Sequence, residues 1–124
     1  MKLPALLLAL LLGAAVLPAL AQGTAPGKET YEDHCAACHR SNGEGLAAKF
    51  PALKQHPVVL GDATKVIGVV LFGEKGPRGQ MPAWQDKLND QEVAAVATYI
   101  RQAWGNQASP VSPEAVQARR SAGK

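Results

Sequence analysis

The sequence predicts a small all-α protein whose N- and C-terminal helices pack together and are joined by long loops. Two segments, residues 62–73 and 89–105, repeat apolar residues at helical spacing, and no segment alternates apolar and polar residues over more than a few positions. Glycine and proline gather between these segments. With 124 residues, the chain is long enough for one domain.

Residues 1–21 have the pattern of a secretory signal peptide. Lys2 supplies the basic start, Leu3–Leu12 an apolar run, and Ala19–Ala21 a small-x-small cleavage site before Gln22. Prolines and a glycine interrupt the apolar stretch, whereas a membrane-spanning helix needs about 20 predominantly apolar residues. We therefore expect cleavage and export to the periplasm; an uncleaved signal would instead anchor the protein in the membrane.

The first half of the mature chain predicts one helix and then a long loop. Residues 28–37 read as a helix with acidic side chains in its early turns, where the helix dipole favours them. Residues 40–61 are rich in glycine and proline and have no steady period. We expect a loop there, with at most one short helical turn.

The middle of the chain predicts a second helix and a second loop. Asp62 has the features of an N-cap, apolar residues follow at helical spacing, and Gly73 lies just past the last of them. Residues 74–84 contain two prolines and two glycines. This composition predicts a loop without a regular element.

The last helix of the domain is the best marked. Asn89 can cap it, Glu92 can complete a capping box, and Gly105 can close it. Its apolar stripe comprises Val93, Val96, Ala97, Ile100 and Trp104. A second start signal at Ser112 predicts a short surface helix from Pro113 to about Arg120. We therefore expect a domain over residues 22–106 and a tail over residues 107–124.

Both cysteines of the chain lie within residues 35–39, which read Cys-Ala-Ala-Cys-His. This pattern is typical of c-type haem attachment, in which Cys35 and Cys38 each form a thioether and His39 is the proximal iron ligand. A thioredoxin-like pair would need alternating strands and helices, and a structural zinc site would need a second pair of ligands; the sequence has neither. A plain disulfide in an exported domain stays open. The pattern predicts one covalently bound haem c.

The second axial ligand decides whether such a haem carries electrons or binds small molecules. Met81 is the only methionine besides the initiator, and its loop of glycine and proline makes poor core material. A thioether at the iron raises the reduction potential. His34 and His56 compete with Met81, but His34 is too close to the attachment turn to reach the far face. His56 lies in a polar stretch that reads as solvated.

Charge and composition narrow the partners and the core. The formal net charge is +3, but basic and acidic side chains balance between Lys28 and Trp104. Nucleic-acid binding is unsupported, because it needs a clustered basic face. Two Phe, two Trp and two Tyr are few for an independent core of about 100 residues. We expect the haem to supply the missing apolar bulk and the apoprotein to fold poorly.

With Cys35, Cys38, His39 and Met81 in this order, the chain resembles a class I, monohaem cytochrome c of the compact bacterial type. The resemblance covers nearly all of the mature sequence. It implies that Gly27 and Tyr31 of the first helix pack against an aromatic residue of the last helix, for which Tyr99 has the right place. It also implies that the carbonyl of Pro51 accepts a hydrogen bond from the proximal imidazole and so fixes the ring.

The stretch from Met81 to Trp84 is similar to a subgroup that includes soluble carriers to terminal oxidases and haem domains of periplasmic dehydrogenases. In such a protein Trp84 would either donate its N–H to a haem propionate or simply pack over the haem edge. One departure from the family stands out. The loop before Met81 is short and lacks the small hairpin often seen there.

We expect an electron carrier that is not an enzyme and has no small-molecule substrate. It would shuttle one electron at a time between respiratory redox proteins, such as a terminal oxidase, a reductase or a dehydrogenase, in weak and short-lived encounters. An alternative is a haem c subunit that accepts electrons within a periplasmic dehydrogenase complex, where the tail would clamp the partner; we expect instead that the tail wraps its own domain. The protein would then be a monomer or a subunit of a redox complex. A gas sensor or peroxidase-like enzyme would instead require an open iron site.

Overall fold

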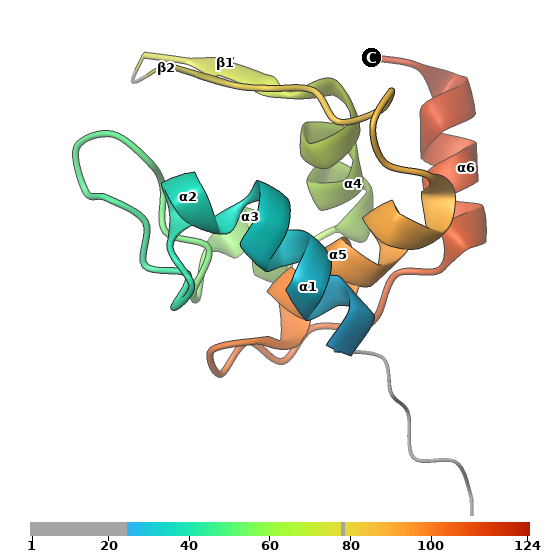
Figure 1. Ribbon diagram of the computed structural model, residues 1–124. Helices are drawn as coiled ribbons and strands as arrows, with labels where there is room; N and C mark the ends of the chain where they lie inside the picture. Colours follow the sequence, from blue (N-terminus) through green and yellow to red (C-terminus); the bar gives the residue numbers. More distant parts are fainter. Residues whose placement is uncertain (1–24, 78) are drawn as a thin grey trace, which may run out of the picture.

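The computed structural model describes residues 25–77 and 79–124. The expected signal peptide, residues 1–21, lies outside the described residues. The elements, labelled in Figure 1, are α1 (Ala25–His34), α2 (Ala36–His39), α3 (Pro57–Leu60), α4 (Ala63–Phe72), β1 (Glu74–Gly76), β2 (Gly79–Met81), α5 (Asp90–Gln102) and α6 (Pro113–Ala122). Among the described residues, no helix combines the length and the apolar character needed to cross a membrane.

The N-terminal helix α1 packs across α5, as the sequence predicts (Figure 1). Gly27 makes this approach possible, because a Cβ there would clash with the carbonyl oxygen of Ala95 on α5. One turn later the fully buried Tyr31 lies against Tyr99, with ring centroids 5.3 Å apart. The pairing of Gly27 and Tyr31 with Tyr99 is thus confirmed, and it fixes the helix that carries the cysteine motif.

Helices α4 and α6 cover the rest of α5. The α4 start is capped by Asp62, whose carboxylate accepts from the backbone N–H of Thr64 at 2.9 Å. The α5 start has the full capping box of Asn89 and Glu92. The tail forms helix α6, and its Val116 is fully buried against the core. The expected helices are therefore present, and the tail folds onto its own domain.

The expectation of a hairpin-free loop before Met81 is wrong. Strands β1 and β2 pair antiparallel, with Glu74 opposite Met81 and Gly76 opposite Gly79. The glycines interpreted as breakers stand at the two ends of the connection, where Gly79 adopts φ +134°. Proline lies within the connection, where it costs no ladder hydrogen bond. Apart from this hairpin and one isolated bridge, the described residues form the all-α fold that was predicted.

Two helix boundaries also differ from prediction. The first helix begins at Ala25, breaks at Cys35 and resumes as α2 through His39, whereas a single helix over 28–37 was expected. Helix α5 ends at Gln102, so Trp104 is not part of its stripe. Trp104 has φ +55° and lies in the turn after the helix, where its ring is 5.1 Å from that of Tyr31.

Candidate haem-binding site

The two cysteines lie at the junction of α1 and α2. Cys35 is buried, Cys38 is exposed, and neither is in a disulfide. Burial, aided by the charge of Cys38, raises the pKa of the Cys35 thiol to about 11. A redox-active pair needs a cysteine with a lowered pKa. Cys35 therefore lacks the lowered pKa of an activated thiol.

His39 is held by its backbone and by one ring nitrogen. Its side chain is buried, and its Nδ1 lies 3.0 Å from the carbonyl oxygen of Pro51, the contact that the family resemblance implies. An Nδ1–H donor to this carbonyl leaves Nε2 free as a ligand atom. Gly45 allows the close approach, because its φ is +62° and a Cβ would clash with the backbone of Phe50 and Pro51.

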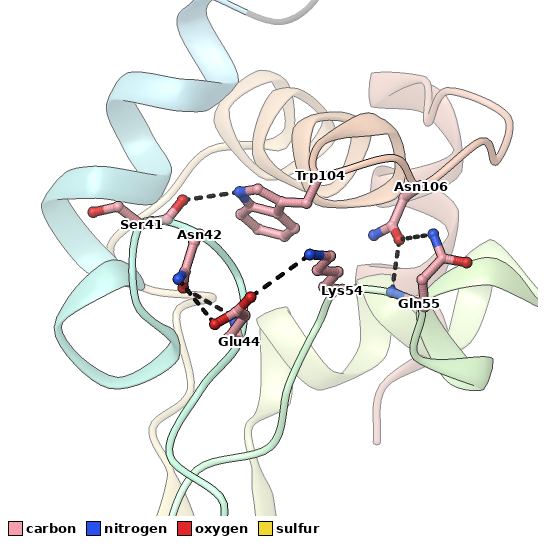
Figure 2. Close-up of polar contacts among 7 residues, drawn as sticks. All are labelled: Ser41, Asn42, Glu44, Lys54, Gln55, Trp104 and Asn106. Atoms are coloured by element: carbon pink, nitrogen blue, oxygen red, sulfur yellow. Dashed lines mark hydrogen bonds and ion pairs between the residues drawn. The ribbon is translucent and has the colours of Figure 1, made fainter.

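The residues after α5 hold the loop that leads from His39 past Pro51. The indole N–H of Trp104 donates to the carbonyl oxygen of Ser41 at 2.8 Å, and the ring covers Gly43, where no Cβ would fit. Asn106 accepts from the backbone N–H of Gln55 at 2.8 Å (Figure 2). This brace joins the C-terminal end of the domain to the segments on either side of Pro51.

The backbone carbonyl oxygens just after the cysteine motif also accept hydrogen bonds. The hydroxyl of Tyr31 donates to the carbonyl oxygen of Arg40 at 2.7 Å. The carbonyl oxygen of Gly43 accepts from the backbone N–H groups of Leu53 and Lys54. Figure 2 also shows the exposed ion pair of Lys54 and Glu44, at 3.6 Å. The loop of residues 40–55 is thus tied to α1, to itself and to the end of α5.

Met81 is the last residue of β2 and is half-buried. Gly73, at φ +70°, lies so close to the carbonyl of Met81 that a Cβ would clash there. Met81 ends β2 and His39 ends α2, and in Figure 1 the β1–β2 hairpin lies above α2. The backbone of Met81 is therefore positioned by the hairpin register and by the close approach of Gly73, just after α4.

Trp84 is half-buried, and its ring packs against two side chains, His34 and Lys87. Its ring centroid is 5.0 Å from that of His34 and 5.3 Å from the ammonium of Lys87. Its backbone N–H donates to Val70 of α4 at 3.0 Å. A propionate contact of the indole stays a prediction, whereas the packing brings the end of α1 to the segment after Met81.

The histidines that compete with Met81 have other contacts. His34 packs on Trp84, and His56 accepts from the backbone N–H of Val58 at 3.2 Å as the N-cap of α3. Within the described residues, no three His, Cys, Asp or Glu side chains gather as a site for a metal ion alone. The donor set fits a haem: two unpaired thiols one turn apart, an imidazole fixed through Nδ1, and a loop thioether.

Comparison with known proteins identifies the family. The family described as cytochrome c oxidase, cbb3-type, subunit III, matches residues 22–100. The protein belongs to this family of cytochrome c domains and is a small monohaem class I cytochrome c. Its cofactor is a covalently bound haem c, as the cysteine motif predicts.

Individual relatives include carriers and subunits. Cytochrome c-552 of Thermus thermophilus is 34% identical over 103 residues, which cover 73% of this chain and 68% of that protein. The cytochrome c subunit of a quinone alcohol dehydrogenase from Gluconobacter oxydans is 39% identical over 111 residues, covering 82% of this chain. The chain spans only about a fifth of the length of the alcohol dehydrogenase subunits that it matches.

A solved structure shares the fold. The c-type cytochrome XoxG of Methylobacterium extorquens AM1 superposes with a TM-score of 0.55 at 22% identity, over 81% of this chain and 67% of that one.

Sequence reasoning did not single out Arg101 and Asn106, which are both buried and bonded to the backbone of distant segments. Arg101 left a signal, since it comes four residues after Ala97 of the apolar stripe and so lies on the same side of the helix.

Proposed function

We propose that this protein is a one-electron carrier of the periplasm, in which Cys35 and Cys38 attach the haem and His39 and Met81 are the axial ligands. The observation that carries the proposal is the bond between His39 Nδ1 and the carbonyl of Pro51, next to two unpaired thiols. It orients the ring and presents Nε2 as a ligand atom. When bound, the haem supplies reversible one-electron oxidation and reduction of its iron.

The residues of the chain keep the site rigid and set the potential. The Pro51 carbonyl makes the His39 imidazole more basic, and a Met81 thioether raises the reduction potential. Tyr31 and Trp104 hold the carbonyls of Arg40 and Ser41, so the turn after the motif has little freedom to rearrange. A site held in this way changes little between its oxidised and reduced forms, which favours fast electron transfer.

The ligand assignment is tested by absorption spectroscopy of the mature protein. With Met81 on the iron, the oxidised protein has the weak red charge-transfer band of thioether ligation and does not bind carbon monoxide when reduced. Met81→Ala abolishes the band, opens the site to carbon monoxide and lowers the potential. His34→Ala and His56→Ala are the matched controls and keep the band. A band that survives Met81→Ala would refute the assignment.

A second function, a haem c subunit of a dehydrogenase complex, is favoured by the alcohol and gluconate dehydrogenase subunits among the relatives. The tail, however, was its expected clamp, and α6 packs on α4 and α5 of its own domain. We therefore favour the free carrier, which meets an oxidase, a reductase or a dehydrogenase transiently and transforms no small-molecule substrate. A carrier elutes as a monomer from native extracts, whereas a subunit elutes with a larger dehydrogenase.

A further inference from the structure

Arg120, near the end of α6, makes three polar contacts with one segment of the chain. Its Nε donates to the carboxylate of Asp90 at 2.8 Å, and its two terminal nitrogens donate to the carbonyl oxygens of Gln85 and Leu88 at 2.6 and 3.0 Å. The side chain is less than one third exposed. A guanidinium presents its donors from three nitrogens in a rigid planar fork, so it fixes the relative positions of three separate acceptors better than the single ammonium of a lysine.

The segment bound by Arg120 begins four residues after Met81. Its front is docked on the end of α4, because the N–H groups of Trp84 and Gln85 donate to the carbonyl oxygens of Val70 and Leu71, both at 3.0 Å. These carbonyls belong to the last turn of α4, which has no partners for them within the helix. The other side of the same segment is held by Arg120. The chain after Met81 is therefore gripped between α4 and α6.

We propose that Arg120 is a positioning residue for Met81, and that α6 serves to keep the thioether at its ligand position. The inference rests on the proposed function, because it concerns the same iron ligand. Met81 has one fixed side in the β1–β2 ladder, where it pairs with Glu74. On the C-terminal side of Met81, the contacts of residues 84–90 with α4 and with Arg120 hold the chain. Without Arg120 this segment keeps the α4 contacts of Trp84 and Gln85 but loses its hold on the α6 side, so it loosens and the thioether leaves more often.

The test compares Arg120→Gln with Arg119→Gln in the mature, haem-loaded protein. Arg119 is the matched control, because it lies on the same helix, packs over the ring of Phe72 and bonds the carbonyl of Gly123, but none of its described contacts reaches residues 84–90. Imidazole is the probe, since it binds oxidised haem only when the thioether leaves. The midpoint of chemical unfolding is measured for each variant.

We expect Arg120→Gln to bind imidazole about tenfold more tightly than the parent and to lose part of the charge-transfer band, as the loss of charged hydrogen bonds implies. Arg119→Gln should match the parent. Equal imidazole binding in all three proteins would overturn the inference. It would also be overturned if both variants weakened the site in proportion to their loss of stability.

If Arg120→Gln does not yield folded protein, Arg120→Lys is measured instead. It keeps the positive charge beside Asp90 but not the planar fork of three nitrogens, so tighter imidazole binding supports the inference and unchanged binding overturns it. The parent protein separates this inference from the proposed function. A parent without the thioether band refutes the ligand assignment itself, whereas a parent with the band and an unaltered Arg120→Gln refutes only the role of Arg120.

Discussion

Asn106 and Arg101 are polar side chains that are only 3% exposed, and all their described partners lie in loops or at helix ends. Arg101 donates to the carbonyl oxygens of Val59 and Gly61 at the end of α3. Asn106 uses both ends of its amide, because Oδ1 accepts from Gln55 while Nδ2 donates to the loop and to α5. A buried polar group is tolerated when its bonding capacity is satisfied. These two residues therefore set the shape of a loop that lacks regular structure.

Replacing Asn106 by Ala tests this bracing role. The change removes the acceptor of the Gln55 N–H and the donor of the Leu53 and Ile100 carbonyls, so one buried and two part-buried groups lose their partner. We expect the free energy of unfolding to fall by about 2–4 kcal/mol. Gln107→Ala, at the exposed neighbouring position, should change it by less than about 0.5 kcal/mol. Chemical denaturation of both variants checks the difference, and equal stabilities would contradict a bracing role for Asn106.

At the scale of elements, local sequence signals predict where the helices lie and where they begin, but not where they end. The capping box of Asn89 and Glu92 and the cap at Asp62 are readable because their partners lie within three residues. The end of α5 is set instead by distant contacts, since Trp104 leaves the helix to bond Ser41, 63 positions away. The hairpin was missed for a similar reason. Three residue pairs give no periodicity, and its glycines serve as turn residues only once the strands have paired.

The cap of α4 predicts a pH-dependent contribution of Asp62. The hydrogen bond from the Thr64 N–H lowers the pKa of this carboxyl below its ordinary value of 3.8. A group whose pKa is lower when folded stabilises the fold above its unfolded pKa, and this contribution is lost as the pH falls through the folded value. Asp62→Ala should therefore be less stable than the parent near neutral pH, with a gap that shrinks below pH 3.8.

Asp62→Asn is the matched control for this cap. Asparagine keeps the acceptor oxygen but carries no charge, so the stability difference between Asp62→Asn and Asp62→Ala should not change with pH. Thermal unfolding of the three proteins across the acid range measures both gaps. A constant gap between Asp62→Ala and the parent would show that the ionised carboxylate has no part in the cap.

The whole molecule has a core that is unevenly built. Of the two Phe, two Trp and two Tyr, only the tyrosines are buried, and most of the buried cluster is Val, Ala and other aliphatic residues, chiefly from α4 and α5. Within residues 25–77 and 79–124, the exposed large apolar side chains are Leu46, Val58 and Leu60, and all three lie between the cysteine motif and α4. The helical side of the molecule thus has its own packing, whereas residues 40–60 depend on a few braces and, when it is bound, on the haem.

Removal of the haem should therefore unfold the two sides unequally. A Cys35→Ala, Cys38→Ala double variant, expressed with the machinery that matures the parent, lacks both thioethers and should lose the haem on purification. A chain of about 100 residues with so few buried aromatic side chains has little margin of stability. We expect amides of residues 40–60 to exchange with solvent almost freely, while α1 and α5 keep partial protection through Gly27, Tyr31 and Tyr99.

The single variant Cys38→Ala is the control, because it keeps one thioether and should retain the haem and its cooperative unfolding. Hydrogen exchange is measured for the parent, the double variant and Cys38→Ala. Uniform protection in the double variant would contradict unequal unfolding, because it would mean that the polypeptide folds without its cofactor.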